Sequence, residues 1–156
     1  MNLEPNKVNY DSRENGIYQV AVAGTVKAIA DELYMELSNS GYSLLDTDVL
    51  AIMINEVQYY ASWAVLEVQR LSAGGVTLIG DSTNIHAYEW AILNPVVRAH
   101  CDLIQARLME SSRSLGGDGF GLTVSEANQI YLESRTRMQF EASYEPPFSI
   151  KTIDGN

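Results

Sequence analysis

The segment Gly80-Asp81-Ser82-Thr83 holds the residue types of a nucleophilic site, because it sets a serine beside an aspartate after an apolar stretch. A serine nucleophile also needs a histidine base and an acid that orients it. The chain has two histidines: His86 is four residues from Ser82, too close to be the usual distant partner, and His100 falls in a helical pattern. A turn followed by a helix cap accounts for the same segment, because Asp, Ser and Asn are favoured there. We therefore predict that the chain is not an enzyme and name no catalytic residue.

A phosphate or metal site is also weakly supported. Gly117, Gly119 and Gly121 imitate half of a glycine-rich phosphate loop, yet no lysine follows them and no strand precedes them. Two histidines fourteen residues apart and one cysteine do not form a metal-ligand set. The acidic residues within 31–36 could bind a cation, but such a cluster on a helix is usually a solvated face. We predict no metal and no cofactor.

Composition and charge limit the class of partner. The chain has 156 residues, of which 46% are hydrophobic, and it carries a net charge of −10 with only three lysines. The length predicts one domain. The acidic balance argues against binding to nucleic acid or to an anionic membrane surface, since both need a basic patch. An acidic surface can instead form a channel wall along which DNA slides without sticking.

Targeting and redox signals favour a reducing cytoplasm. No apolar run approaches the length of a membrane span, and the first seven residues lack both the basic and the apolar region of a secretory signal. The single cysteine, Cys101, cannot form an internal disulfide. Because Cys101 lies in a helical pattern, we predict that its side chain is small, apolar and buried.

Apolar residues at helical spacing predict the first two helices. One runs over residues 17–38, and the other is a long helix of roughly 23 residues over 49–71, which Asp46 or Thr47 can cap. The long helix has apolar residues on a second face as well. It therefore packs on both sides or contacts another subunit.

The second half of the chain predicts a strand and two more helices. Val76–Ile79 is typical of a short strand between glycine turns. Pro95 predicts a short helix, a kink near the proline, and a longer helix to about Ser114. Thr123-Val124-Ser125-Glu126 is a capping box that opens a final helix ending at about Phe140.

The predicted fold is mainly α, a bundle of about four helices with a short β-hairpin or loop insertion and extended N- and C-terminal arms. The arms span residues 1–16 and 141–156, the bundle spans 17–140, and the insertion spans 72–86. The surplus of apolar and aromatic side chains indicates a contact between subunits, although core packing explains most of them equally well. The candidates for a subunit interface are Tyr59, Trp63, Leu66 and Trp90.

The C-terminal arm is the most unusual segment. Two adjacent prolines fix the backbone and remove two donors, so the segment cannot join a helix and is expected to run extended. An extended apolar arm on a helical body favours a subunit that inserts its tail into a neighbour, and a tail packed on its own domain is the alternative. The arm residues are Tyr144, Glu145, Pro146, Pro147, Phe148, Ser149 and Ile150.

The block from Asn94 to Ile150 resembles a head-to-tail connector protein of tailed bacteriophages, also called an adaptor or head-completion protein. The likeness rests on the helix that begins Pro95-Val96-Val97-Arg98, its continuation over 111–116, the loop Gly119-Phe120-Gly121, the helix that begins Val124-Ser125-Glu126, and the terminal segment 145–150. It covers the C-terminal third to half of the chain. These motifs are structural and not catalytic.

This resemblance implies a virion structural protein. Connectors of this kind form a ring, typically of twelve copies, under the portal protein. Their C-terminal arms insert into the portal, their other face receives the next neck or tail-completion protein, and DNA passes through the channel without specific binding. The chain would then be made in the host cytoplasm and end in the neck of the virion, between capsid and tail. The resemblance makes the arm residues 144–150 the portal-binding arm.

A second class of function stays open. A small acidic helical protein can act as a regulator or inhibitor through protein–protein binding, by imitating the charge of nucleic acid. That function predicts a compact acidic patch, whereas the acidic residues here are spread along the chain.

Overall fold

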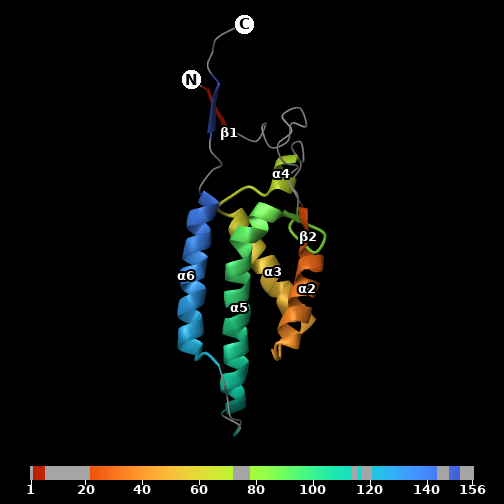
Figure 1. Ribbon diagram of the computed structural model, residues 1–156, viewed down its shortest axis with the longest axis vertical. Helices are drawn as coiled ribbons and strands as arrows, with labels where there is room; N and C mark the ends of the chain where they lie inside the picture. The colour runs from red at the N-terminus through yellow and green to blue at the C-terminus, as the bar shows by residue number, and fades with distance from the viewer. Residues whose placement is uncertain are drawn as a thin grey trace.

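The fold is known from a computed structural model that describes residues 2–5, 22–71, 78–113, 116, 121–143 and 148–151. Within these residues the protein is mainly helical, and its helices form a bundle with a small antiparallel sheet beside it (Figure 1). The predicted fold class is therefore confirmed. The elements are β1 (Asn2–Pro5), β2 (Val22–Thr25), α2 (Val26–Asn39), α3 (Asp46–Ala61), α4 (Glu67–Leu71), β3 (Asn84–His86), α5 (Ala87–Arg113), α6 (Val124–Ser143) and β4 (Phe148–Lys151).

The first helix begins later than its apolar spacing predicts. Residues 22–25 form β2, which pairs antiparallel with β3, and α2 starts at Val26. Thr25 stops the helix from extending backwards, because its backbone is extended and its Oγ1 accepts a hydrogen bond from the Ala28 N–H at 3.1 Å. Tertiary pairing with a distant strand thus overrides the helical pattern here.

The long second helix was also predicted incorrectly. It is interrupted after Ala61, and the short helix α4 follows at Glu67. Two side chains satisfy backbone donors at the restart: Gln69 Oε1 accepts from the Leu66 N–H at 3.1 Å, and Glu89 Oε1 accepts from the Glu67 N–H at 2.8 Å. The N-terminus of α3 differs from the prediction as well, because Asp46 is its first residue and the Asp48 carboxylate accepts from the Leu45 N–H.

The β element lies a few residues beyond the predicted strand. Leu78 and Ile79 are not in a strand, and residues 76 and 77 lie outside the described residues. The strand β3 instead begins at Asn84, inside the predicted insertion over 72–86, and its partner is β2 and not a neighbouring hairpin strand.

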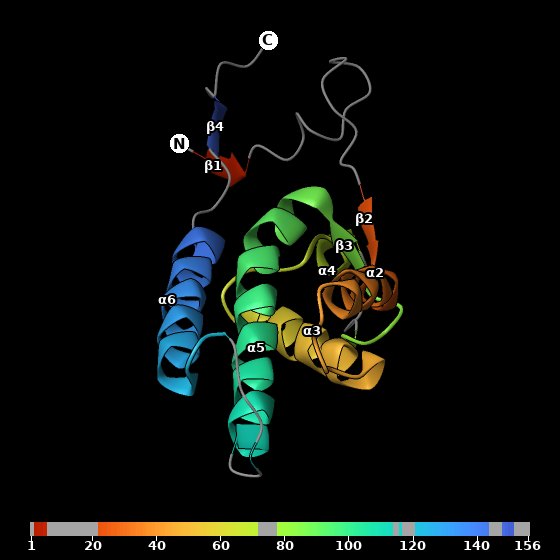
Figure 2. The same cartoon turned by 60° about the horizontal axis from the view of Figure 1, so that its bottom comes forward.

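The helix α5 continues through Pro95 as one element of 27 residues. The proline sits in the third turn, and Figure 2 shows the first turns bending away from the rest of the helix, as the missing N–H and the ring require.

The predicted capping box of α6 is confirmed: Thr123 Oγ1 accepts from the Glu126 N–H at 3.2 Å, and Glu126 accepts from the Thr123 N–H at 2.9 Å. The helix runs to Ser143, three residues past the predicted end.

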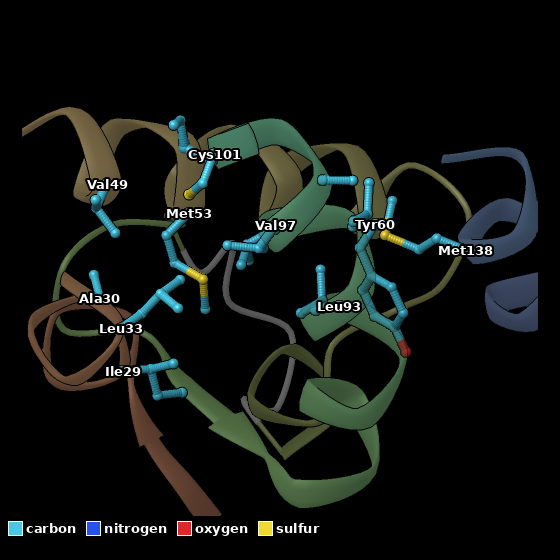
Figure 3. Packing of buried hydrophobic residues seen from close by; sticks show 14 of the residues in the cluster. Ile29, Ala30, Leu33, Val49, Met53, Tyr60, Leu93, Val97, Cys101 and Met138 are labelled. Carbon is cyan, nitrogen blue, oxygen red and sulfur yellow. The ribbon is translucent and has the colours of Figure 1, made fainter. Parts of the chain in front are cut away.

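The core lies between α2, α3 and α5. Figure 3 shows Leu33 from α2, Met53 from α3 and Val97 from α5 meeting in it. Cys101 is fully buried in the same cluster, as predicted, and burial raises the pKa of its thiol to about 12. The helix α6 packs along α5 on the opposite side from α2, so it is an outer helix of the bundle (Figure 1).

Candidate interaction surfaces

The predicted portal-binding arm is described only in part. Residues 144–147, which include Tyr144, Glu145, Pro146 and Pro147, lie outside the described residues. Phe148, Ser149 and Ile150 belong to β4, which pairs antiparallel with β1. Ile150 faces Leu3 in the register, and Phe148 faces Pro5. The N-terminal and C-terminal segments therefore pair with each other. The prediction of two separate arms did not include this pairing.

Of the four predicted interface residues, Leu66 is placed in the interior. It is fully buried, between α3 and α4, because the chain turns inward where the predicted long helix breaks. It cannot form a subunit contact, and this prediction is wrong. Trp90 and Tyr59 are partly buried against the core, whereas Trp63 is 44% exposed.

Tyr59 and Trp63 form the aromatic edge of a larger polar cluster. Their rings meet edge to face, with centroids 6.3 Å apart. The guanidinium of Arg135, on α6, lies 3.6 Å from the centre of the Tyr59 ring. This cation–π contact joins α3 to α6. Part of the aromatic surplus in α3 is thereby used within the monomer.

The centre of this cluster is a carboxylate with no exposed surface. Glu56 Oε1 accepts a hydrogen bond from the Tyr131 hydroxyl at 2.8 Å and lies 2.7 Å from His100 Nδ1. Its other oxygen lies 3.6 Å from Arg135 Nε. Buried charges cost free energy unless they are paired and hydrogen-bonded. Burial and the bond to Glu56 raise the pKa of Tyr131, so the hydroxyl stays a donor.

The sequence holds a signal for this cluster that our sequence analysis missed. Glu56 occupies a position of the apolar stripe of α3, between the buried residues Met53 and Tyr60. A lone acid in such a stripe indicates a buried partner on another helix. The identity of the partners, His100, Tyr131 and Arg135, depends on how α5 and α6 pack, which the spacing of one helix does not contain.

A second buried carboxylate, Glu89, joins the first turn of α5 to α4 and β3. Its two oxygens accept from the Glu67 and His86 backbone N–H groups, both at 2.8 Å. His86 Nδ1 lies 3.5 Å from Glu89, and the Tyr88 hydroxyl donates to Glu67 at 2.8 Å. The Glu89 carboxylate therefore caps the start of α5, and the buried His86 ring packs against it.

The serine block forms a turn. Thr83 N–H donates to the Gly80 carbonyl at 3.0 Å, and Gly80 N–H donates to Thr83 Oγ1 at 2.9 Å. The carbonyls of Asp81 and Thr83 then accept from the first N–H groups of α2. Ser82 is exposed, and no contact joins it to a histidine within the described residues. The block thus caps α2.

Two acidic side chains of α2 are engaged in ion pairs. Asp31 is paired with Lys27 at 3.0 Å, and Glu36 forms a two-pronged pair with Arg98 of α5, at 2.7 and 2.8 Å. The bond to Arg98 lowers the pKa of Glu36. Within the part of the chain that the structure describes, three or more His, Cys, Asp or Glu side chains nowhere converge in a way that could hold a metal ion.

The helix α6 has an exposed apolar face. Phe140 is 68% exposed and Leu132 is 54% exposed, and both point away from the side that packs on α5. They border a shallow groove with Glu133, Thr136 and Arg137. Among the described residues, no helix combines the length and the apolar content needed to cross a membrane.

Comparisons with known proteins give no relative. No protein-family model matches the chain, and neither a curated protein nor a solved structure does. The functional argument therefore rests on the residues and their geometry.

Proposed function

We propose that the chain is a subunit of the head-to-tail connector ring of a tailed phage, attached under the portal protein by its paired end segments. The observation that carries the proposal is the pairing of β1 with β4, which form a two-stranded sheet separate from the β2–β3 sheet of the bundle. Together with the sequence resemblance, this pairing suggests a helical body whose attachment element is the two-stranded ribbon of β1 and β4.

A two-stranded ribbon is a suitable element for docking. Two strands alone are marginally stable in water, and each has one edge of backbone donors and acceptors that its partner strand does not use. A strand of another protein can complete such an edge by β-addition. We infer that the portal protein supplies this strand. A ring of about twelve weak contacts would hold firmly through avidity.

The charge of the chain supports the same function. A net charge of −10 gives a ring that repels DNA in its channel, so that DNA passes without specific binding. The opposite face of the ring would then receive the next neck or tail-completion protein.

The first test is quantitative peptide mass spectrometry of virions of the phage that encodes the chain, normalised to the portal protein. We expect about one copy per portal subunit, as a symmetric neck component requires. Absence from virions, together with abundance in infected cells, would contradict the proposal and favour the acidic regulator that acts by protein–protein binding.

A second test separates the ribbon from the body. Removal of residues 144–156 leaves α6 complete, since the helix ends at Ser143. We expect a folded protein that no longer co-purifies with the portal. Ser149→Pro should act similarly, because it removes a backbone donor from β4, whereas Ser149→Ala should bind normally. Portal binding by the truncated protein would show that the ribbon is not the attachment element.

A further inference from the structure

The outward face of α6 has a pattern that is complementary to itself. Leu132 and Phe140 each lie four residues from Thr136, so the three side chains follow one row along the helix. The row has a large apolar side chain at each end and a small side chain in the middle. A second copy can be placed by a rotation of 180° about an axis that is perpendicular to the helix and passes beside Thr136. Leu132 of each copy then lies over Phe140 of the other.

The charges beside this row follow the same symmetry. Glu133 and Arg137 are one turn apart on the neighbouring row and also line the groove. The same rotation brings Glu133 of each copy towards Arg137 of the other. Within the described residues Arg137 forms no ion pair, as is also true of Arg107, and Glu133 accepts a hydrogen bond from the Gln129 amide at 3.0 Å.

The charge of α6 opposes such a contact only weakly. Two copies of a chain with net charge −10 repel each other. The helix α6 carries three acidic and two basic residues, Glu126, Glu133, Glu141, Arg135 and Arg137, so its net charge is −1. A contact through α6 therefore brings little of the repelling charge into the interface.

We propose that two copies of the chain form an antiparallel, two-fold symmetric dimer through the outward faces of their α6 helices, with Thr136 at the crossing point. A small residue at the crossing allows an interaxial distance of about 8–10 Å. One helix face is smaller than the roughly 800 Å² per partner of a standard interface, so the dimer dissociates on dilution. The inference is independent of the connector function. A two-fold contact closes at two copies, and a larger ring must use other surfaces.

Cysteine cross-linking tests the geometry directly. The native Cys101 is buried, so a new exposed cysteine reacts alone. Thr136→Cys places a thiol on the two-fold axis, and we expect a short bismaleimide to convert it to a covalent dimer. Ser125→Cys is the matched control on the same face. Residue 125 lies about 16 Å along the helix from residue 136, which puts its two copies about 33 Å apart. Equal cross-linking of both variants would overturn the antiparallel arrangement.

Charge exchange tests the partner. Sedimentation equilibrium gives the dissociation constant of the dimer for each variant. Glu133→Arg and Arg137→Glu should each weaken the dimer about threefold to fivefold, and the double variant should restore it, because the symmetry exchanges the two charges. Phe140→Glu should weaken it more than tenfold, whereas Met35→Glu, on the exposed surface of α2, should not. A chain that stays monomeric at every concentration, or a double variant weaker than either single variant, would overturn the proposal.

Discussion

The helix α5 is joined to its neighbours by different chemistry on its two sides. Towards α2 and α3 the centre of the contact is apolar and buried, as Met53 and Val97 illustrate (Figure 3), and the Glu36–Arg98 pair lies at its exposed edge. Towards α6 the contact includes a polar cluster, in which Glu56 of α3 lies against His100 of α5 and against Tyr131 and Arg135 of α6. The apolar side depends on shape and volume, which tolerate exchange among similar residues. The polar side depends on a few specific pairs, which do not.

A pair of matched tyrosines makes this comparison testable. Tyr131 donates its hydroxyl to Glu56, whose side chain is fully buried, and Tyr42 donates its hydroxyl to Asp102, which is partly exposed. Both bonds link a tyrosine to a carboxylate, but they lie on opposite sides of α5. The free energies of unfolding that are lost when each hydroxyl is removed can therefore be compared. Their difference measures how much burial of the carboxylate strengthens the hydrogen bond.

The largest effect is expected for Glu56→Ala. The substitution leaves Arg135 and His100 without their buried partner, and we expect the free energy of unfolding to fall by about 3–5 kcal/mol. Glu56→Gln should cost less, because an amide oxygen still accepts from Tyr131. Urea denaturation followed by circular dichroism measures the change.

Amide hydrogen exchange shows which helices lose stability in a variant. Glu56→Ala should speed amide exchange mainly in α6, since this cluster holds α6 to the bundle. Met53→Ala is the matched control on the apolar side, with an expected cost of about 2–5 kcal/mol, and should speed exchange in α2 and α3. Equal acceleration of all helices in both variants would mean that the two sides unfold as one unit.

Tyr131→Phe should have the next largest effect. It removes one hydrogen bond to a buried carboxylate and keeps the ring, so we expect a loss of about 1.5–3 kcal/mol. The cost should nearly disappear in the Glu56→Ala background, because the acceptor is already gone. Additive costs in that double-mutant cycle would show that the hydroxyl has a different partner.

The sequence was sufficient to predict features that are encoded locally. The capping box at Thr123 and Glu126 depends on residues three apart, and the burial of Cys101 depends on the period of one helix. Both predictions are confirmed. Helices also occupy most of the predicted helical ranges, although their ends moved and the predicted second helix is divided into α3 and α4.

Features that depend on distant partners could not be predicted in this way. Residues 22–25 are a strand because they pair with 84–86. The second helix breaks after Ala61 and resumes as α4 at Glu67, whose N–H donates to Glu89, 22 residues away. Leu66 was mistaken for a surface residue for the same reason. The Glu56 cluster is intermediate between these two cases. The position of Glu56 in the apolar stripe of α3 indicates a buried carboxylate, but the sequence does not identify its partners.

The smallest effect is expected at Tyr42, and it should depend on pH. Burial, followed by the hydrogen bond to Asp102, raises the pKa of Tyr42 to about 12, whereas an unfolded tyrosine titrates near 10. Between these values the unfolded chain has lost the proton and the folded chain retains it. The stabilisation is therefore complete below pH 10 and is lost as the pH rises towards 12.

Tyr42→Phe should cost about 1 kcal/mol at neutral pH, and it should make the fall in stability above pH 10 less steep. Some decline should remain, because burial also raises the pKa of Tyr131 and of Cys101. Urea denaturation between pH 8 and pH 11 is the measurement, with Asp102→Asn as the control that keeps an acceptor and removes the charge. If Tyr42→Phe costs as much as Tyr131→Phe at neutral pH, burial of the carboxylate does not distinguish the two sides of α5, and the contrast between them must come from Arg135 and His100 alone.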